Sequence, residues 1–389
     1  MDLVRIGASA LQFGARTLAA LGMVILAGSA ALAAPTIETP ARHAYLMDAE
    51  TGAVLLDKAA DAPMPPASMS KLMTAYMLFE RLKEGKLSLT DTFPVSENAW
   101  RKGGSKMFVE VNSRVAVEDL IRGIIVQSGN DACIVVAEGL AGSEEAFAEQ
   151  MTRRARELGL TNSAFRNSTG WPDPGHYMTA HDLATLAQRI INDFPEYYKY
   201  YSETEFTYHG IKQGNRNPLL YKNMGVDGLK TGHTEESGYG LTASAVRNGR
   251  RLILVVNGLS GPNERSREAE RLIEWGFREF ENYSLAKAGE PIEEAPVWLG
   301  ASYTVPLVVE RDLVVTLDRQ ARRDMKVTVA YDGPVAAPIR QGDRVGTISV
   351  SAPDMKTVER PLVAGTDVEP LGLFGKLGAA VGYFIRGAS

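Results

Sequence analysis

Two pairs of strand-forming segments, far apart in the chain, constrain the fold more than any other feature of this sequence. Residues 239–246 and 251–257 flank Asn248-Gly249, and a two-residue Asn-Gly loop between β-rich runs is the strongest short-range signal of a hairpin. A second hairpin is predicted at 44–57, around a turn that ends at Gly52. We expect the early hairpin to find its partners in the late one, which closes one antiparallel sheet with segments from both ends of the region.

Helical periodicity fills the interval between these hairpins. Apolar residues recur there at spacings of three and four, the pattern of an amphipathic helix, and the same pattern returns just after the second hairpin. These helical segments are 68–83, 117–125, 131–140, 144–158, 180–191 and 264–280. Strands at both ends with helices between them predict an α+β domain, in which an antiparallel sheet packs against a helical lobe.

The character of the sequence changes after a predicted linker at 286–291. Short alternating runs between residues 297 and 363, broken by turns at Asp332 and Gln341, predict a small all-β module. This module contains no histidine or cysteine, so we expect it to act in spacing or docking rather than in chemistry. The predicted boundaries are a signal peptide at 1–33, a catalytic domain at 38–284, a β-rich domain at 290–366 and a membrane-binding tail at 370–389.

The first 33 residues have the pattern of a secretory signal peptide. Arg5 and Arg16 precede an apolar run that begins at Leu18 and ends in small residues. Cleavage is expected after Ala33, because a cut one residue later would place Pro35 directly after the scissile bond. A retained anchor helix is the alternative, although the apolar core is short for a membrane span.

Charge and cysteine content argue against several classes of protein. The formal net charge is -5 and no run of lysine and arginine reaches five residues, so nucleic acid is not an expected partner. Cys133 is the single cysteine, and there is no C-x-x-C or H-x-x-x-H pair. We therefore expect no metal site, no metal-dependent hydrolysis and no cofactor.

The first chemical motif is Ser68-x-x-Lys71, at the start of a predicted helix. A spacing of three puts the lysine amine on the same helix face as the serine hydroxyl. Burial or a neighbouring cation would lower the lysine pKa, so that the neutral amine can accept the serine proton. The start of the helix also offers free backbone N–H groups to developing negative charge. Taken alone, the same pair is also common on surface helices.

Two further motifs follow in the chain. In Ser128-Gly-Asn130, the serine could relay a proton, and the Asn130 amide could donate to a substrate carbonyl and hold Lys71. The alternative is that Asn130 or Asp131 only caps the next helix. In the third motif, Lys230-Thr231-Gly232, the lysine could bind a substrate carboxylate and lower the pKa of Lys71 by like-charge proximity. The alternative is that Lys230 is an exposed loop lysine.

The order and spacing of the three motifs resemble those of the serine penicillin-binding proteins and class A β-lactamases. The resemblance implies a β-lactamase/transpeptidase-like fold and an acyl-enzyme on Ser68. It also implies an oxyanion hole made by the N–H groups of Ser68 and His233, and substrate binding by the Lys-Thr-Gly strand that includes Thr231. Gly232 would leave room for a peptide lying along that strand.

Segments 169–176, 215–220, 226–234 and 275–277 are similar to those of the low-molecular-mass D-alanyl-D-alanine carboxypeptidases. That resemblance implies removal of the terminal D-alanine from peptidoglycan pentapeptide stems and covalent inhibition by β-lactam antibiotics. It also implies a periplasmic enzyme held peripherally at the inner membrane. Arg265 is a candidate to bind the terminal carboxylate, with Arg267 as the alternative.

Three other functions remain possible from the sequence. A β-lactamase would need a base that deacylates the enzyme quickly, and we find no Glu-x-x-Leu-Asn segment in the expected interval. An endopeptidase that cuts crosslinks would use the same motifs. A non-catalytic peptidoglycan sensor is disfavoured, because a binding protein needs no paired nucleophile and base.

The C-terminal tail has the pattern of an amphipathic helix that lies in a membrane interface. At about 100° per residue, one sector about 120° wide collects most of its apolar side chains, while Lys376 and Arg386 lie outside it. Because of its four interior glycines, the alternative is a disordered or self-docked tail. The members of the apolar sector are Leu373, Phe374, Leu377, Val381, Phe384, Ile385 and Ala388.

Overall fold

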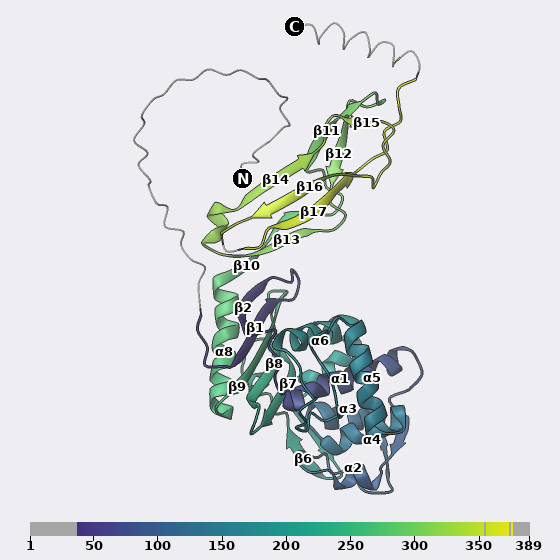
Figure 1. The fold of residues 1–389 in the computed structure, drawn as a ribbon, viewed down its shortest axis with the longest axis vertical. Coiled ribbons are helices and arrows are strands. Elements are labelled where there is room, and N and C mark those ends of the chain that lie inside the picture. Colours follow the sequence, from purple (N-terminus) through teal and green to yellow (C-terminus); the bar gives the residue numbers. More distant parts are fainter. Residues whose placement is uncertain (1–36, 354, 373–374, 376–389) are drawn as a thin grey trace, which may run out of the picture. The chain divides into compact units, whose positions relative to one another are not determined.

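The computed structural model describes residues 37–353, 355–372 and 375 of the 389-residue chain (Figure 1). This chain divides into two compact units, one spanning Ile37–Arg278 and the other beginning at Glu279. The predicted signal peptide and the apolar sector of the predicted tail lie outside the described residues. In the described part of the chain, no helix combines the length and the apolar character needed to cross a membrane.

A five-stranded antiparallel sheet, in the order β2-β1-β9-β8-β7, forms one layer of the first unit. The predicted pairing of the early and late hairpins is confirmed, because β1 lies between β2 and β9. Asn248 and Gly249 both have positive φ, as a two-residue hairpin loop requires. The strands are β1 (His43–Asp48), β2 (Val54–Lys58), β7 (Val226–Thr234), β8 (Gly238–Arg247) and β9 (Arg250–Leu259).

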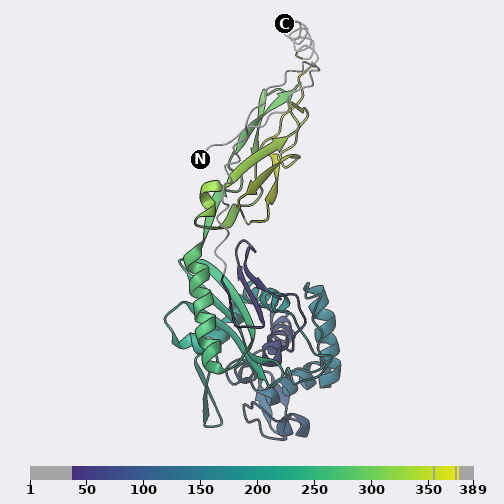
Figure 2. The same cartoon turned by 60° about the vertical axis from the view of Figure 1, so that its left-hand side comes forward.

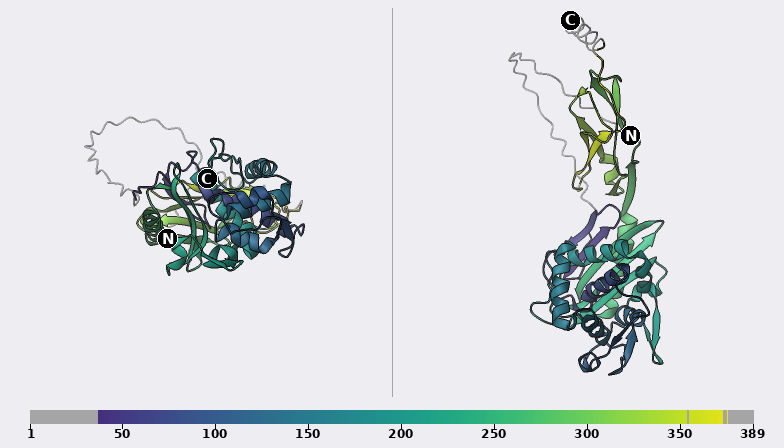
Figure 3. Two further views of the ribbon diagram at one scale, coloured as in Figure 1. Left: turned by 90° about the horizontal axis from the view of Figure 1, so that it is seen from below. Right: turned by 90° about the vertical axis from the view of Figure 1, so that its right-hand side faces the viewer.

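Helices cover both faces of this sheet (Figures 1 and 3). Helix α8 lies on one face, where Gly276 brings it so close that an added Cβ would lie 2.8 Å from a methyl of Leu46. The remaining helices form the predicted lobe on the other face. Figure 2 shows the sheet and the helices on its two faces from a second side. The helices are α1 (Lys71–Lys83), α2 (Glu97–Arg101), α3 (Val117–Ile125), α4 (Asn130–Ala141), α5 (Glu144–Glu157), α6 (Ala180–Asp193), α7 (Pro195–Tyr198) and α8 (Pro262–Glu279).

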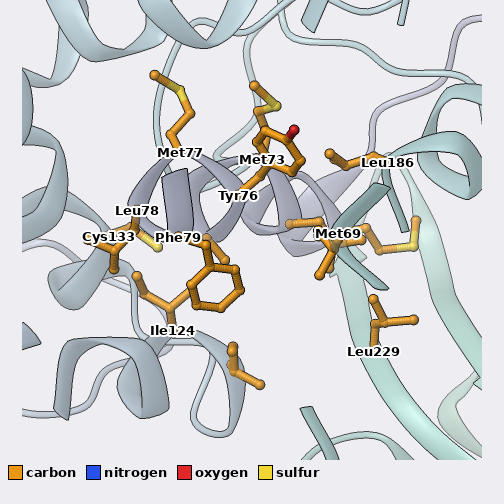
Figure 4. Packing of buried hydrophobic residues seen from close by; sticks show 14 of the residues in the cluster. Met69, Met73, Tyr76, Met77, Leu78, Phe79, Ile124, Cys133, Leu186 and Leu229 are labelled. Atoms are coloured by element: carbon orange, nitrogen blue, oxygen red, sulfur yellow. The ribbon is translucent and has the colours of Figure 1, made fainter. Parts of the chain in front are cut away.

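Helix α1 runs through the centre of the lobe (Figure 4). Met73 and Phe79 of this helix are fully buried. Ile124 of α3 and Cys133 of α4 are also buried, each with an exposed fraction of 1% or less. A helix that is apolar on nearly every side belongs in the interior of a domain. The Ser68-x-x-Lys71 motif at its start is therefore held by a buried helix in the core of the unit.

Short elements that the sequence analysis did not predict complete the lobe. They are two small antiparallel sheets of two strands each and several 3-10 turns. The strands are β3 (Thr92–Pro94), β4 (Arg114–Ala116), β5 (Glu205–Tyr208) and β6 (Ile211–Gly214). Helix α2 lies between β3 and β4 in the chain, whereas β5 and β6 form a hairpin.

The second unit is all-β, as predicted. It contains a two-stranded sheet, β10-β13, and a six-stranded sheet in the order β14-β16-β17-β12-β11-β15. The unit begins before the predicted linker, because residues 280–286 form β10 and pair with β13. The strands are β10 (Phe280–Ala286), β11 (Glu293–Trp298), β12 (Thr304–Val308), β13 (Leu313–Asp318), β14 (Lys326–Tyr331), β15 (Val335–Ala336), β16 (Arg344–Ser351) and β17 (Val358–Ala364).

Candidate active site

Ser68 lies in a 3-10 turn, η1 (Ala67–Ser70), which leads directly into α1. The predicted helix thus starts with a tighter turn, and Ala67 adopts a positive φ of 48° at its entrance. A spacing of three still brings the two motif residues together, because side chains at i and i+3 eclipse in a 3-10 turn. The Lys71 Nζ atom lies 2.8 Å from Ser68 Oγ.

The Lys71 amine contacts three oxygen atoms. Besides Ser68 Oγ, it donates to Asn130 Oδ1 at 2.8 Å and to the carbonyl of Thr169 at 2.5 Å. The last two oxygens are acceptors only, so each of them requires a hydrogen from the amine. A neutral amine has two hydrogens and one lone pair. If the neutral amine uses its two hydrogens to donate to Asn130 Oδ1 and to the Thr169 carbonyl, its lone pair faces the Ser68 hydroxyl.

Burial makes this neutral form accessible. Lys71 is 1% exposed, and burial is the main cause that lowers its pKa to about 8. The positive charge of Arg216 lowers the pKa further, while the carboxylates of Asp131 and Glu144 act in the opposite direction. We expected Lys230 to be the cation responsible. Burial and Arg216 are the causes that lower the pKa of Lys71 here.

The Ser128-Gly-Asn130 motif connects α3 to α4. Ser128 has a positive φ of 57° and is 1% exposed. Asn130 is the first residue of α4, and its amide donates to the carbonyl of Gly103 at 2.8 Å while its oxygen accepts from Lys71. The alternative that Asn130 only caps the helix is wrong, because the capping position is Gly129 and the first-turn N–H of Ala132 donates to the Asp131 side chain at 2.9 Å.

Lys230 lies on β7 and is 2% exposed, so the alternative of an exposed loop lysine is wrong. Its Nζ atom donates to Ser128 Oγ at 2.9 Å and to the carbonyl of Thr231 at 3.1 Å. Burial, followed by the positive charge of Lys71, holds the pKa of Lys230 well below its usual range. The two buried amines therefore lie in one site and compete for protons.

Gly232 permits a close approach between β7 and η1. A Cβ at this position would lie 2.8 Å from the carbonyl oxygen of Pro66 and 3.1 Å from Met69. The side chain is thus excluded by the turn that carries Ser68. This reason differs from the predicted one, which was room for a peptide. Strand β7 is the edge strand of its sheet, so one side of its backbone faces away from β8.

Three aromatic and cationic side chains form the end of the site beyond Gly232. The exposed imidazole of His233 stacks on Tyr239, with ring centroids 3.9 Å apart. The Arg265 guanidinium lies 5.7 Å from the centroid of the same tyrosine ring. Arg265 is 9% exposed and its Nε has no hydrogen-bond partner among the described residues, whereas Arg267 is exposed. Burial, above all, lowers the pKa of Arg265.

The carbonyl of Thr169 was not predicted as part of the site. It reaches Lys71 because the loop 167–171 winds around the Asn167 side chain, whose oxygen accepts from the N–H groups of Thr169, Gly170 and Trp171. Gly170 lies against η1 so closely that a Cβ would be 1.9 Å from the carbonyl oxygen of Ala67. Only the family-like wording of 169–176 pointed to this loop.

Asp131 is a second residue that the sequence analysis left without a role in the site. Its fully buried carboxylate accepts hydrogen bonds from the backbone N–H groups of Met107, Phe108 and Val109, at 2.9 to 3.2 Å. These hydrogen bonds hold residues 107–109 at the start of α4. The preceding loop, which includes the Gly103 carbonyl, is held there with them. Asp131 thereby fixes a partner of Asn130, in addition to accepting from the Ala132 N–H in the first turn of α4.

Metal chemistry has no visible site here. In the part of the chain that the structure describes, no three side chains of histidine, cysteine, aspartate or glutamate cluster in a way that could hold an ion. The side chains that converge on Ser68 are instead amines and amides. They can move a proton, bind a carboxylate and stabilise negative charge.

Comparisons with known proteins identify the same chemistry. Residues 29–261 match the family described as D-alanyl-D-alanine carboxypeptidase, peptidase S11, and residues 280–370 match the C-terminal domain of penicillin-binding protein 5. The chain is 39% identical to the D-alanyl-D-alanine carboxypeptidase DacC of Escherichia coli K12, over 91% of this chain and 92% of that protein. It is 40% identical to DacA of the same organism, over 85% and 84% of the two chains.

Solved structures give the same result for the fold. Penicillin-binding protein 5 from Haemophilus influenzae matches with a TM-score of 0.78 and 38% identity, covering 86% of this chain and 100% of that one. Penicillin-binding protein 6B from Escherichia coli matches with a TM-score of 0.70 and 35% identity, covering 85% and 98%.

Proposed function

This chain belongs to the D-alanyl-D-alanine carboxypeptidase family and is a serine-type carboxypeptidase, and we propose that it acts on peptidoglycan pentapeptide stems through an acyl-enzyme on Ser68. The observation that carries the proposal is the position of the Lys71 amine, whose Nζ lies 2.8 Å from Ser68 Oγ and is held there by Asn130 and Thr169. An amine with a pKa of about 8 is partly neutral at neutral pH and can serve as a base.

In the first step, Lys71 accepts the Ser68 proton as the oxygen attacks the carbonyl of the penultimate D-alanine. The oxyanion is held by the N–H groups of Ser68 and His233. The free edge of β7 supports this assignment, because an edge strand offers backbone donors to an extended peptide. The imidazole of His233 is stacked on Tyr239 and takes no part in proton transfer.

In the second step, the proton reaches the leaving amine of D-alanine through Ser128. Two contacts support a proton relay between the amines of Lys71 and Lys230. Ser128 accepts from Lys230, and Asn130 accepts from Lys71. Water then attacks the acyl-enzyme as Lys71 accepts its proton, the bond between Ser68 Oγ and the acyl carbon breaks, and Lys71 returns the proton to Ser68 as the product leaves.

The terminal carboxylate of the substrate is bound by Lys230 and Thr231, with Arg265 contributing positive charge. Arg265 acts electrostatically on Lys230, and its buried Nε is free to donate among the described residues. A bound carboxylate raises the pKa of Lys230 and keeps it charged. The proton then stays on Lys230, which leaves Lys71 as the neutral amine of the pair.

The direct test is to incubate the mature protein with a pentapeptide ending in D-Ala-D-Ala and to measure free D-alanine. Ser68→Ala and Lys71→Ala should release none above background, whereas Lys83→Ala, at the exposed end of the same helix, should behave like the parent. A fluorescent penicillin should label the parent covalently and fail to label Ser68→Ala. Labelling of that variant, or D-alanine release by it, would move the nucleophile elsewhere.

We also propose that the protein is exported through a cleaved signal peptide at 1–33 and is held peripherally at the inner membrane by its tail. The support is the sequence of these two segments, with the amphipathic pattern of 373–388. Deletion of 371–389 should abolish sedimentation with anionic liposomes and leave peptide hydrolysis unchanged. Equal sedimentation of the full-length and truncated proteins would contradict the proposed membrane anchor and would leave the proposed enzyme activity standing.

A further inference from the structure

The structure points to a second membrane contact, built on the β-rich unit. We propose that the turn between β11 and β12, residues 298–303, inserts Trp298 and Tyr303 into the interfacial layer of a lipid bilayer. We call residues 298–303 the aromatic turn. The proposal rests on the attachment through the tail proposed above, and adds to it a site on the folded protein.

The exposure of the aromatic turn is the first observation. Tyr303 is 93% exposed and Trp298 is 40% exposed, and Ala301 and Ser302 between them are exposed as well. Tyr303 has the largest exposed fraction of the large apolar and aromatic side chains that are exposed in the described part of the chain. Tryptophan and tyrosine are the residues that collect at membrane–water interfaces, since each combines an apolar ring with a polar group.

The position of the aromatic turn is the second observation. Gly300 forms an isolated antiparallel bridge with Pro370. The N–H of Leu371 donates to the carbonyl of Leu299 at 2.8 Å, and the N–H of Ala301 donates to Glu369 at 2.7 Å. The aromatic turn is therefore hydrogen-bonded to the last residues before the apolar tail.

Chain length then limits how far the aromatic turn can lie from the membrane. Leu373, the first member of the apolar sector, follows Leu371 by two positions, which span at most about 7 Å when fully extended. An interfacial helix has its apolar face buried about 5–10 Å into the boundary between headgroups and acyl chains. A tail bound in this way holds the aromatic turn at headgroup level.

The charges around the aromatic turn show which force acts there. Arg340 forms an exposed ion pair with Glu369, and the neighbouring Asp367 accepts from the backbone of Gln341. These groups supply no excess of positive charge to attract anionic lipids. The contact made by the aromatic turn is therefore apolar and insensitive to salt, whereas Lys376 and Arg386 of the tail provide the salt-sensitive part.

The test places an environment-sensitive fluorophore on the full-length mature protein through Tyr303→Cys. The native Cys133 is buried and does not compete for the label. Glu310→Cys is the matched control, since it follows the opposite end of β12 (Thr304–Val308), about 17 Å along the strand. The probe is a vesicle of phosphatidylethanolamine and phosphatidylglycerol, with and without a spin-labelled lipid as quencher.

We expect the fluorophore at position 303 to shift its emission to shorter wavelength on vesicles and to be quenched by the spin-labelled lipid. The fluorophore at 310 should do neither. If the protein sediments with vesicles but position 303 reports only water, the proposal is overturned while the tail attachment stands. If the full-length protein does not sediment at all, both are overturned. A shift on isolated peptidoglycan and not on vesicles would identify a glycan strand as the occupant, and would equally overturn the proposal.

A second measurement uses unlabelled protein. The double variant Trp298→Ser/Tyr303→Ser should bind these vesicles about tenfold more weakly at low and at high salt, because it loses apolar area from the interface. D-Alanine release from a soluble peptide should be unchanged, since neither residue belongs to the catalytic unit. Unchanged vesicle affinity in the folded variant would contradict the proposal.

Discussion

The pKa of Lys71 makes a quantitative prediction about how fast the enzyme is acylated at different pH values. Burial lowers this pKa to about 8, and the base must be neutral to accept the Ser68 proton. About one enzyme in eleven then has a neutral Lys71 at pH 7, and about ten in eleven at pH 9. The second-order rate constant for acylation should therefore rise about tenfold between pH 7 and pH 9.

The assay is the time course of labelling by a fluorescent penicillin, with Ser68→Ala as the blank and with correction for spontaneous hydrolysis of the drug at each pH. Circular dichroism at each pH shows that the protein stays folded. A rate constant that does not change between pH 6.5 and pH 9 would refute the role of Lys71 as the titrating base.

Lys230 gives this experiment its matched variant. Burial and Arg216, rather than Lys230, lower the pKa of Lys71, so Lys230→Gln should leave the midpoint of the pH profile close to that of the parent. Its plateau should fall, because in the proposed mechanism Lys230 binds the carboxylate of the substrate or drug. Lys230→Arg keeps the charge and should keep part of the activity. A midpoint that moves in Lys230→Gln would show that Lys230 does act on Lys71, and plateaus equal to that of the parent in both variants would show that it does not bind the carboxylate.

Three further substitutions test the support of the site. Gly170→Ala would put a Cβ 1.9 Å from the Ala67 carbonyl, so we expect displacement of η1 and a loss of acylation rate of about a hundredfold or more, measured by labelling. Asp131→Asn replaces a buried acceptor of four N–H groups, and urea denaturation should show a loss of about 3 kcal/mol in unfolding free energy. His233→Ala removes only the stacking on Tyr239, so kcat/KM for peptide should fall less than tenfold, and a loss of several orders of magnitude would show imidazole chemistry.

Local patterns predicted the elements that depend on neighbouring residues. The spacing of Ser68 and Lys71 placed their side chains together, and the periodicity of 117–125 matches the observed bounds of α3. The Asn248-Gly249 loop was predictable because its dipeptide favours positive φ at both positions. The short strand pairs β3-β4 and β5-β6 were missed, since strands of three or four residues carry too little pattern.

Contacts between distant segments escaped the sequence analysis for a different reason. The carbonyl of Thr169 is a backbone group, and no residue type marks a backbone acceptor. Arg216 lowers the pKa of Lys71 from a segment that the motifs do not include. Asp131 looked like a helix cap because its partners, in the loop at 107–109, precede it by more than twenty residues. Tertiary packing assigns these roles, and a single sequence does not encode them locally.

The pairing of β1 with β9 also determines when this unit can fold. The first strand is made at residues 43–48, yet its inner neighbour in the sheet is complete only at Leu259. A chain that emerges from its N-terminus onward therefore holds β1 and β2 without their main partner until almost the whole unit has appeared. Because distant pairings must close a long loop before they gain any contact, folding should be slow and nearly all-or-none. Ser68, early in the unit, therefore meets Lys230 only when the unit is nearly complete, so no much shorter nascent chain can carry the finished site.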